Sequence, residues 1–268
     1  MKKISALILT AVMTVSVFAG CGKSTETTSS KNVNSLQAIK DSGKITIGLD
    51  DSYPPMEYRD EKNNLVGFDI DFSNELAKKL GVKAEFVTTD FNGIILALKS
   101  GKFNAIVSAL SITDARKQEI EFSVPYIDGG QIIVTKKDTS SINTKEDLKG
   151  KIIGCQLGST GEQAAAKLEG TKEVKRYDKI TEAFHDLSIG RVEAIVVDSQ
   201  VGGYYMKKDG GGYKILNERL TKEPQGIGLK KEDKELKEAI DKAFSELKAD
   251  GTLTKLSIKW FGYDIYSQ

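Results

Sequence analysis

The sequence predicts an α/β fold of two similar lobes, each built on a parallel sheet covered by helices. Strand-like and helix-like segments alternate from about residue 35 to residue 198, and such alternation is typical of βαβ units. Two segments also repeat. LKSGKFNAIVSA, from Leu98, and LSIGRVEAIVVD, from Leu187, share a leucine, a glycine, a basic residue, an apolar residue and then Ala-Ile-Val, 89 residues apart. This repeat favours two lobes of the same architecture.

The first half contains two strand-helix units and a third strand. Gly81 and Gly101 follow the two helical patterns, at positions where glycine commonly ends a helix. The expected elements are a strand at 45–50, a helix at 72–81, a strand at 84–89, a helix at 93–101 and a strand at 104–110.

The second half restarts the same order and then closes with helices. The expected elements are a strand at 151–156, a helix at 159–170, a strand at 173–178, a helix at 180–190 and a strand at 192–198. Residues 230–251 then place four apolar side chains on one helical face. Open α/β sheets bind ligands at the carboxyl ends of their strands. Two facing lobes would therefore put residues 108–111 and 196–199 on opposite walls of a cleft.

Residues 1–20 are typical of a secretory signal peptide, because two lysines precede an apolar run that ends in small residues. The run is too short to cross ~30 Å of hydrocarbon, which takes about 20 apolar residues. VFAGC at 17–21 resembles the lipobox of bacterial lipoproteins, so we expect Cys21 to be lipidated. Phe18 departs from the usual Leu or Val, and the alternative is a plain signal peptide. Residues 21–36 are polar, and we expect a flexible tether after the lipidated cysteine.

The composition excludes several classes of function. The chain has 39 basic and 38 acidic residues among 268, so nothing in it predicts a nucleic-acid partner. Cys155 lies in an apolar strand-like run and is expected to be a buried thiol. His185, the single histidine, lies in a helical pattern. We expect no metal, no cofactor, no catalytic residue and a monomer.

A set of motifs in a fixed order resembles a known family. GLDDSYPPMEY, LVGFDIDF, FNGIILALKSGKFNAIVSALSIT-x-x-R, FSVPY, LGSTGE, EAIVVD and ADGTLTKLSIKWFG occur between about residue 38 and the end. They resemble the polar amino-acid-binding proteins of ABC importers, which are the bacterial extracellular solute-binding proteins of family 3.

The resemblance implies a type II periplasmic-binding-protein-like fold, with two α/β lobes joined by two crossover strands and a ligand cleft between them. The crossovers would fall near 126–131 and 217–225. Lobe 1 would comprise residues 37–128 and 221–268, and lobe 2 residues 129–220. A free L-amino acid would bind between the lobes, which close by hinge motion and deliver it to the membrane subunits of an ABC importer. The protein would be extracytoplasmic and anchored to the bacterial membrane by lipid on Cys21.

Carried onto this sequence, the resemblance implies a carboxylate site. Arg116 matches the family's carboxylate clamp, and a guanidinium can hold both oxygens; the alternative is a solvated helix arginine. Ser159 and Thr160 match the contribution of the second lobe, at a helix start whose backbone N–H groups suit an anion. Ser159 with Glu162 is also a capping box, which explains these residues structurally.

The ammonium group of the ligand would meet Asp198, the acid that ends the apolar strand 192–198. Polar groups around Ser108, Ala109 and Ser111 would complete its hydrogen bonds. The alternative for Asp198 is an acid at a strand end, exposed to water.

The pocket for the ligand's side chain would involve Tyr53, Phe91, Asp50 and Gln156. Aromatic rings beside an acid suit a guanidinium or ammonium tip, which favours arginine or lysine. Family members that bind glutamine also carry an acid at the position of Asp50, so glutamine or cystine is the alternative. Asp50 or its neighbour Asp51 would otherwise cap the turn before Pro54.

Two other classes of function compete with amino-acid binding. Relatives with this fold include dehydratases, so an enzyme is one alternative. A ligand-sensing domain for a membrane partner is the other.

Overall fold

The computed structural model describes residues 35–208, 210 and 212–267. The predicted signal peptide and Cys21 lie outside these residues, as does most of the predicted tether. Among the described residues, no helix combines the length and the apolar character that crossing a membrane requires.

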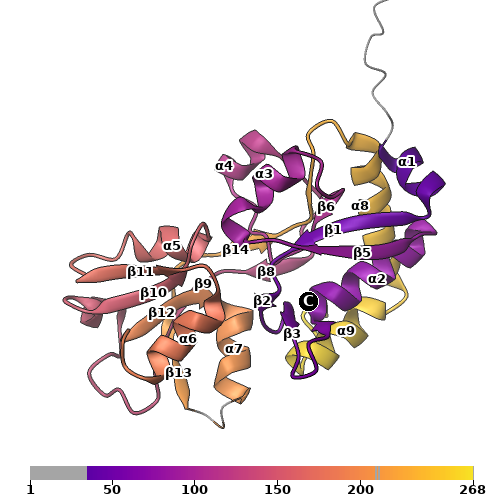
Figure 1. The fold of residues 1–268 in the computed structure, drawn as a ribbon. Coiled ribbons are helices and arrows are strands. Elements are labelled where there is room, and N and C mark those ends of the chain that lie inside the picture. The colour runs from indigo at the N-terminus through magenta and orange to yellow at the C-terminus, as the bar shows by residue number, and fades with distance from the viewer. Residues whose placement is uncertain (1–34, 209, 211, 268) are drawn as a thin grey trace, which may run out of the picture. The chain divides into compact units, whose positions relative to one another are not determined.

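The first lobe is built on a five-stranded sheet in the order β5–β1–β6–β15–β7 (Figure 1). β1 pairs in parallel with β5 and β6, whereas β15 runs antiparallel to β6 and β7. The sheet is therefore mixed, and the prediction of a purely parallel sheet is wrong. Its strands are β1 (Lys44–Leu49), β5 (Lys83–Thr88), β6 (Ala105–Ile106), β7 (Glu121–Phe122) and β15 (Gly228–Leu229).

β6 is much shorter than the predicted strand 104–110. Asn104 comes just before β6: its backbone N–H donates to the Thr46 carbonyl, and its side chain accepts hydrogen bonds from the backbone N–H and hydroxyl of Thr46. At the other end, Ala109 has a positive φ of 45°, which a strand does not contain. The polar residues that follow Ile106 thus lie in a bent segment beyond the sheet.

Among the described residues, six helices belong to the first lobe. The central one, α2, packs against β1, β5, α8 and α9. It buries Phe68, Phe72 and Leu76, which are spaced by four residues, so the helix starts one turn before the predicted position. Gly81 ends it in the left-handed conformation, as predicted. The helices are α1 (Ser35–Ser42), α2 (Phe68–Leu80), α3 (Ile94–Lys99), α4 (Asp114–Glu119), α8 (Lys234–Ala249) and α9 (Thr252–Phe261), with a 3-10 turn η1 (Phe91–Gly93).

The second lobe repeats this arrangement around the sheet β11–β10–β12–β9–β13. β10 is parallel to β11 and β12, and β9 is antiparallel to β12 and β13. Figure 1 shows α6 and α7 beside this sheet, and both pack against its strands. The elements are β9 (Gln131–Lys136), η2 (Lys145–Leu148), β10 (Ile152–Gln156), α5 (Thr160–Ala165), β11 (Glu173–Tyr177), α6 (Ile180–Ser188), β12 (Ala194–Asp198), α7 (Ser199–Lys208) and β13 (Tyr213–Arg219).

Two short strands connect the lobes. β8 (Ile127–Gly129) leads into β9, β14 (Glu223–Gln225) leads into β15, and the two pair antiparallel. They lie within the segments predicted as crossovers, and β9 and β15, which follow them, are the antiparallel strands of the two sheets. The lobe boundaries proposed from the sequence fall in β8 and three residues before β14, and they stay a prediction. A separate small sheet, β2 (Ser52–Tyr53), β3 (Glu57–Arg59) and β4 (Leu65–Val66), lies between β1 and α2 in the chain.

Candidate functional site

Asp198 is a buried acid at the end of β12, the strand that the apolar run before it predicts. Its side chain accepts hydrogen bonds from the Tyr53 hydroxyl at 2.6 Å, from the Gln131 amide at 3.0 Å and from the Gln225 amide at 3.2 Å. All three donors are neutral. Burial raises the pKa of Asp198 to about 7, although the hydrogen bond from Tyr53 and the charge of Arg116 lower it. A cation placed beside this carboxyl group would therefore stabilise its ionised form.

Arg116 is buried as well, so the reading of a solvated helix arginine is wrong. Thr113 caps the short helix α4 through the Arg116 N–H. The guanidinium donates to the Ser111 carbonyl at 2.8 Å and to the Gly158 carbonyl at 3.2 Å, and it lies 5.5 Å from the centre of the Phe91 ring. Burial lowers the pKa of Arg116. The side chain is thus held by two carbonyls, one from each lobe.

Ser159 and Thr160 start α5. The Ser159 hydroxyl accepts from the Glu162 N–H at 3.0 Å and donates to the Gln156 carbonyl at 2.7 Å. The Glu162 carboxylate accepts from the Gly158 N–H, so the predicted reciprocal capping box is only half formed, and its second half is shifted by one residue. The Thr160 hydroxyl lies 3.2 Å from the Ser111 hydroxyl. The Ser159 hydroxyl is therefore engaged in local hydrogen bonds, and the backbone N–H is the group of this residue that is available to a ligand.

Asp50 makes two sets of contacts, and the first is the turn-capping role predicted from the sequence as an alternative. One carboxylate oxygen accepts from the Ser52 N–H and hydroxyl, at 2.9 and 2.6 Å, and so shapes the turn before Pro54. The other oxygen accepts from the Gln156 amide of the second lobe at 2.5 Å. Burial raises the pKa of Asp50. The buried acid at the end of β1 therefore has one oxygen committed to the turn and one facing the second lobe.

Ser108 and Ala109 lie just beyond β6, beside Asp50. The Ser108 hydroxyl accepts from the Asp50 N–H at 3.1 Å and donates to Glu57 at 2.6 Å. The Ala109 N–H donates to Asp69 at 2.8 Å. Two buried acids of the first lobe thus hold these two residues.

The structure brings the predicted residues together. Of the eleven, only Phe91 is partly exposed, and the other ten are buried. Contacts of these residues that join the lobes include Tyr53 with Asp198, Asp50 with Gln156, Ser111 with Thr160, and Arg116 with Gly158.

Sequence reasoning missed several buried polar residues that bond to the predicted ones, including Gln131, Gln225, Glu57 and Asp69. Gln131 donates to Thr160 and Asp198, and Gln225 donates to Asp198. Both glutamines are in or next to the strands that connect the lobes. The sequence did contain a signal for them, because Gln131 and Gln225 are polar residues at the ends of the two predicted crossovers.

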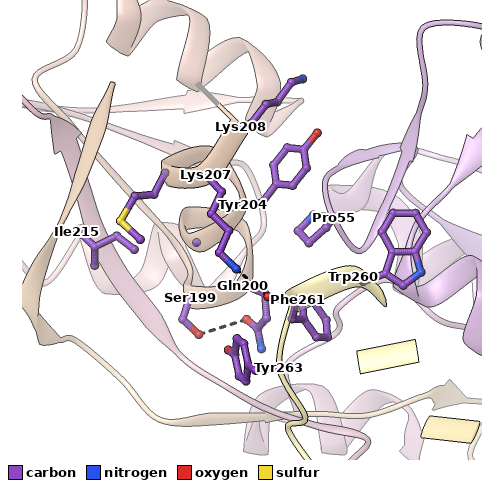
Figure 2. A pocket seen from close by; sticks show the side chains of 12 residues that line it. Pro55, Ser199, Gln200, Tyr204, Lys207, Lys208, Ile215, Trp260, Phe261 and Tyr263 are labelled. Atoms are coloured by element: carbon purple, nitrogen blue, oxygen red, sulfur yellow. Dashed lines mark hydrogen bonds between the residues drawn. The ribbon is translucent and has the colours of Figure 1, made fainter. Parts of the chain in front are cut away.

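A cavity of about 530 Å³ lies away from these residues, between α7 and α9 (Figure 2). Trp260, Phe261 and Tyr204 are among its lining, and none of the eleven predicted residues is. Lys207 of α7 donates to the Phe261 carbonyl at the end of α9 at 2.8 Å. This cavity is mainly apolar and offers no acid to an ammonium group, so we do not assign the ligand to it.

Cys155 is buried in β10, as expected, and burial raises its pKa to about 12. A thiol with that pKa is a poor nucleophile at neutral pH. His185 is exposed on α6. No group of three metal-binding side chains occurs within residues 35–208, 210 and 212–267.

Residues 45–263 match the profile of the bacterial extracellular solute-binding proteins, family 3. The chain belongs to this family. One curated relative of this family 3 solute-binding protein is the L-cystine-binding protein TcyJ of Escherichia coli, which is 34% identical over 231 residues, covering 86% of this chain and 87% of the relative.

Solved structures give the same assignment. An ancestral arginine-binding protein bound to arginine is 47% identical, with a TM-score of 0.78. The match covers 82% of this chain and 99% of the ancestral protein's chain. An ancestral amino acid-binding protein described as a precursor of cyclohexadienyl dehydratase is 39% identical, with a TM-score of 0.80, and covers 85% of this chain and 99% of its own. The two-lobe fold predicted from the motifs is therefore confirmed.

Proposed function

We propose that this solute-binding protein captures a free L-amino acid between its two lobes and delivers it to the membrane subunits of an ABC importer. The observation that carries the proposal is that a buried acid, Asp198, and a buried guanidinium, Arg116, each lie where the two lobes meet: Asp198 accepts from Tyr53 and Arg116 donates to the Gly158 carbonyl across the lobes. An amino acid has an anion and a cation on one carbon. Buried charges are stable only when they are compensated, and this ligand compensates both.

In this proposal the ligand carboxylate binds Arg116 and the start of α5. A guanidinium has five N–H donors, and the Ser111 and Gly158 carbonyls orient the group from two directions. The ammonium binds Asp198, while Ser108, Ala109 and Ser111 supply further polar contacts. Each lobe contributes one charge, so the ligand favours the arrangement in which the lobes are together.

Asp50 supports a basic side chain. It is a buried acid whose outward oxygen faces Gln156, with Tyr53 and Phe91 as the ring contacts implied by the family. A bound arginine or lysine would place its cationic tip beside Asp50, where the neutral Gln156 amide donates in this structure. Glutamine and cystine are the alternatives: the ancestral arginine-binding protein is also described bound to glutamine, and one relative is named for cystine.

Replacing Asp50 with Asn is expected to separate these ligands. The affinity for arginine or lysine should fall about 10- to 100-fold, because a hydrogen bond to a charged group contributes ~1.5–3 kcal/mol. The affinity for glutamine should change little. Asp60→Asn is the control, since this acid lies in the turn between β3 and β4 and its carboxylate accepts hydrogen bonds from residues of that turn. Calorimetry that finds equal losses for arginine and glutamine would refute the basic preference.

Affinity should also depend on pH through Asp198. Its pKa of about 7 without ligand means that binding an ammonium drives proton release below that pH. The affinity should be nearly constant just above pH 7 and should fall by up to about tenfold per unit below it. Calorimetry in two buffers of different ionisation enthalpy measures the released proton. Unchanged affinity down to about pH 5, where Asp198 would be protonated, contradicts the role of this acid.

A thermal-shift screen tests the function itself. The twenty amino acids, with cystine, ornithine and citrulline, are added singly, because a ligand bound only to the folded state raises the melting temperature. Arginine or lysine is expected to give the largest shift. Failure of every basic amino acid, together with a shift from glutamine or cystine, would replace the proposed ligand and keep the class of function.

The proposal includes an extracytoplasmic protein anchored by lipid on Cys21 and acting as a monomer. The family description supports the location. Metabolic labelling with a fatty acid tests the anchor, with Cys21→Ser as the variant that should lose the label.

A dehydratase-like activity is the second candidate, favoured by the similarity to the precursor of cyclohexadienyl dehydratase. Turnover of a prephenate-like substrate would support it. Amino-acid binding without turnover favours the binding protein.

A further inference from the structure

Glu57 and Asp69 form a buried pair of acids beneath the proposed ligand site. Both side chains are 0% exposed. Glu57 begins β3, and Asp69 lies in the first turn of α2. Each uses one oxygen to hold the segment after β6: Glu57 Oε1 accepts from Ser108, and Asp69 Oδ2 accepts from the Ala109 N–H and from the Tyr126 hydroxyl.

The other oxygen of each acid, Glu57 Oε2 and Asp69 Oδ1, has no hydrogen-bond donor if both groups are ionised. The two acids are neighbours, because the Asp69 N–H donates to the carbonyl of Met56, the residue before Glu57, and the two side chains hold the consecutive residues Ser108 and Ala109. One proton between them would turn one of the two oxygens into a donor and satisfy both. Buried polar atoms without partners are rare in folded proteins, so this is the arrangement the geometry requires.

The titratable groups around Glu57 and Asp69 also favour one proton on the pair. The titratable groups that act on the pair are Asp50 at the end of β1, Tyr53 on β2, Tyr126 before β8 and Tyr266 near the C-terminus. They are acids or phenols, which do not compensate a second negative charge. Burial raises both pKa values, that of Asp69 to about 7, and the charge of Asp69 raises the pKa of Glu57 further.

We propose that Glu57 and Asp69 share one proton and act as positioning residues that fix Ser108 and Ala109 for the ligand. The inference rests on the proposed function, because these two residues belong to the proposed ammonium site. Ala109 has a φ of 45°, which is unfavourable for a residue with a side chain. Its hydrogen bond to Asp69 helps to hold this conformation.

The pair also contacts the connection between the lobes. Tyr126 donates its hydroxyl to Asp69, and its backbone N–H donates to the Gln225 carbonyl in β14. One buried group therefore supports both the proposed site and the segment through which the lobes are joined.

Amide substitutions test the shared proton. In Glu57→Gln the new amide donates to Asp69 Oδ1, and in Asp69→Asn it donates to Glu57 Oε2. Each single variant thus replaces the mobile proton with a covalently bound hydrogen. We expect each to keep its ligand affinity within about threefold and its stability near neutral pH. The double variant would place two amino groups against each other, and its affinity should fall at least about tenfold, with a lower melting temperature.

Infrared spectroscopy of the ligand-free protein reports the proton directly. At about pH 8, a carboxylic acid C=O band should be present in the wild type and in Asp198→Asn, and absent from both single amide variants. The exposed Glu85→Gln, whose side chain pairs with Lys44 at the surface, is the control and should keep the band.

The pH dependence of stability gives a second readout that needs no ligand. The raised pKa values mean that the folded state keeps a proton that the unfolded state loses above about pH 4.5. The free energy of unfolding of the wild type should therefore fall as the pH rises through the neutral range. This dependence should be weaker in Glu57→Gln.

A band that persists in both single variants would overturn the inference. So would single and double amides that stabilise the protein progressively, because that result indicates two ionised carboxylates. If no amino acid binds, the proposed function fails, and the infrared and unfolding measurements still decide the proton pair.

Discussion

Asp198→Asn should lower the affinity for the amino-acid ligand by about two to three orders of magnitude. Removing one member of a buried charge pair costs ~3–5 kcal/mol, and each ~1.4 kcal/mol is a factor of ten. The variant leaves the ligand's ammonium group buried against a neutral amide. Isothermal titration calorimetry with the ligand from the screen measures the loss.

The same variant should fold without difficulty. Asn avoids the burial cost that raises the pKa of Asp198 to about 7, so the melting temperature without ligand should be equal to or above that of the wild type. Only the increase caused by ligand should disappear. Asp128→Asn changes the same charge at an exposed position in β8 and should bind normally. A dissociation constant within about threefold of the wild type for Asp198→Asn removes this acid from the site.

Arg116→Met should cost about two to three orders of magnitude in affinity, for the corresponding reason at the carboxylate end. Met keeps much of the apolar contact beside Phe91 but removes every guanidinium donor to the ligand carboxylate. Arg116→Lys should recover part of the loss, because it restores the charge but not the two parallel hydrogen bonds.

Arg191→Met is the control for Arg116. This arginine is exposed and pairs with Asp186 in the second lobe, so its removal changes the net charge equally and should leave binding unchanged. If Arg116→Met bound the ligand carboxylate as well as the wild type does, the anion would have to bind elsewhere, and the start of α5 would be the first place to look.

The strands and helices with strong local patterns were predictable. The spacing of apolar residues and the terminal glycine identify α2, and the apolar run before Asp198 identifies β12. The short β6 was not predictable, because the apolar pattern does not show the positive φ of Ala109, which bends the chain beyond Ile106. The antiparallel strands β9 and β15 also escaped prediction, since their partners are set by where the chain returns to each sheet.

The candidate site likewise contains residues that the sequence identified and residues that it did not. The motifs pointed to Arg116 and Asp198, and the structure buries both. Gln131 and Gln225 were missed because a glutamine in a strand is usually solvent-exposed. The pairing of β9 with β12 sets Gln131 opposite Asp198, whereas Gln225 reaches Asp198 from β14, which pairs with β8. Glu57 and Asp69 were missed for a related reason, since acids near a turn and in the first turn of a helix have ordinary roles at those positions.

The central claim is that one amino acid joins Arg116 and Asp198 through its own two charges. Calorimetry of the wild type with arginine, with agmatine, which lacks the carboxylate, and with the deaminated guanidino acid, which lacks the ammonium, tests this claim most directly. Arginine should bind, and each analogue should bind at least about 100-fold more weakly. Binding of either analogue within about tenfold of arginine would contradict the proposed site.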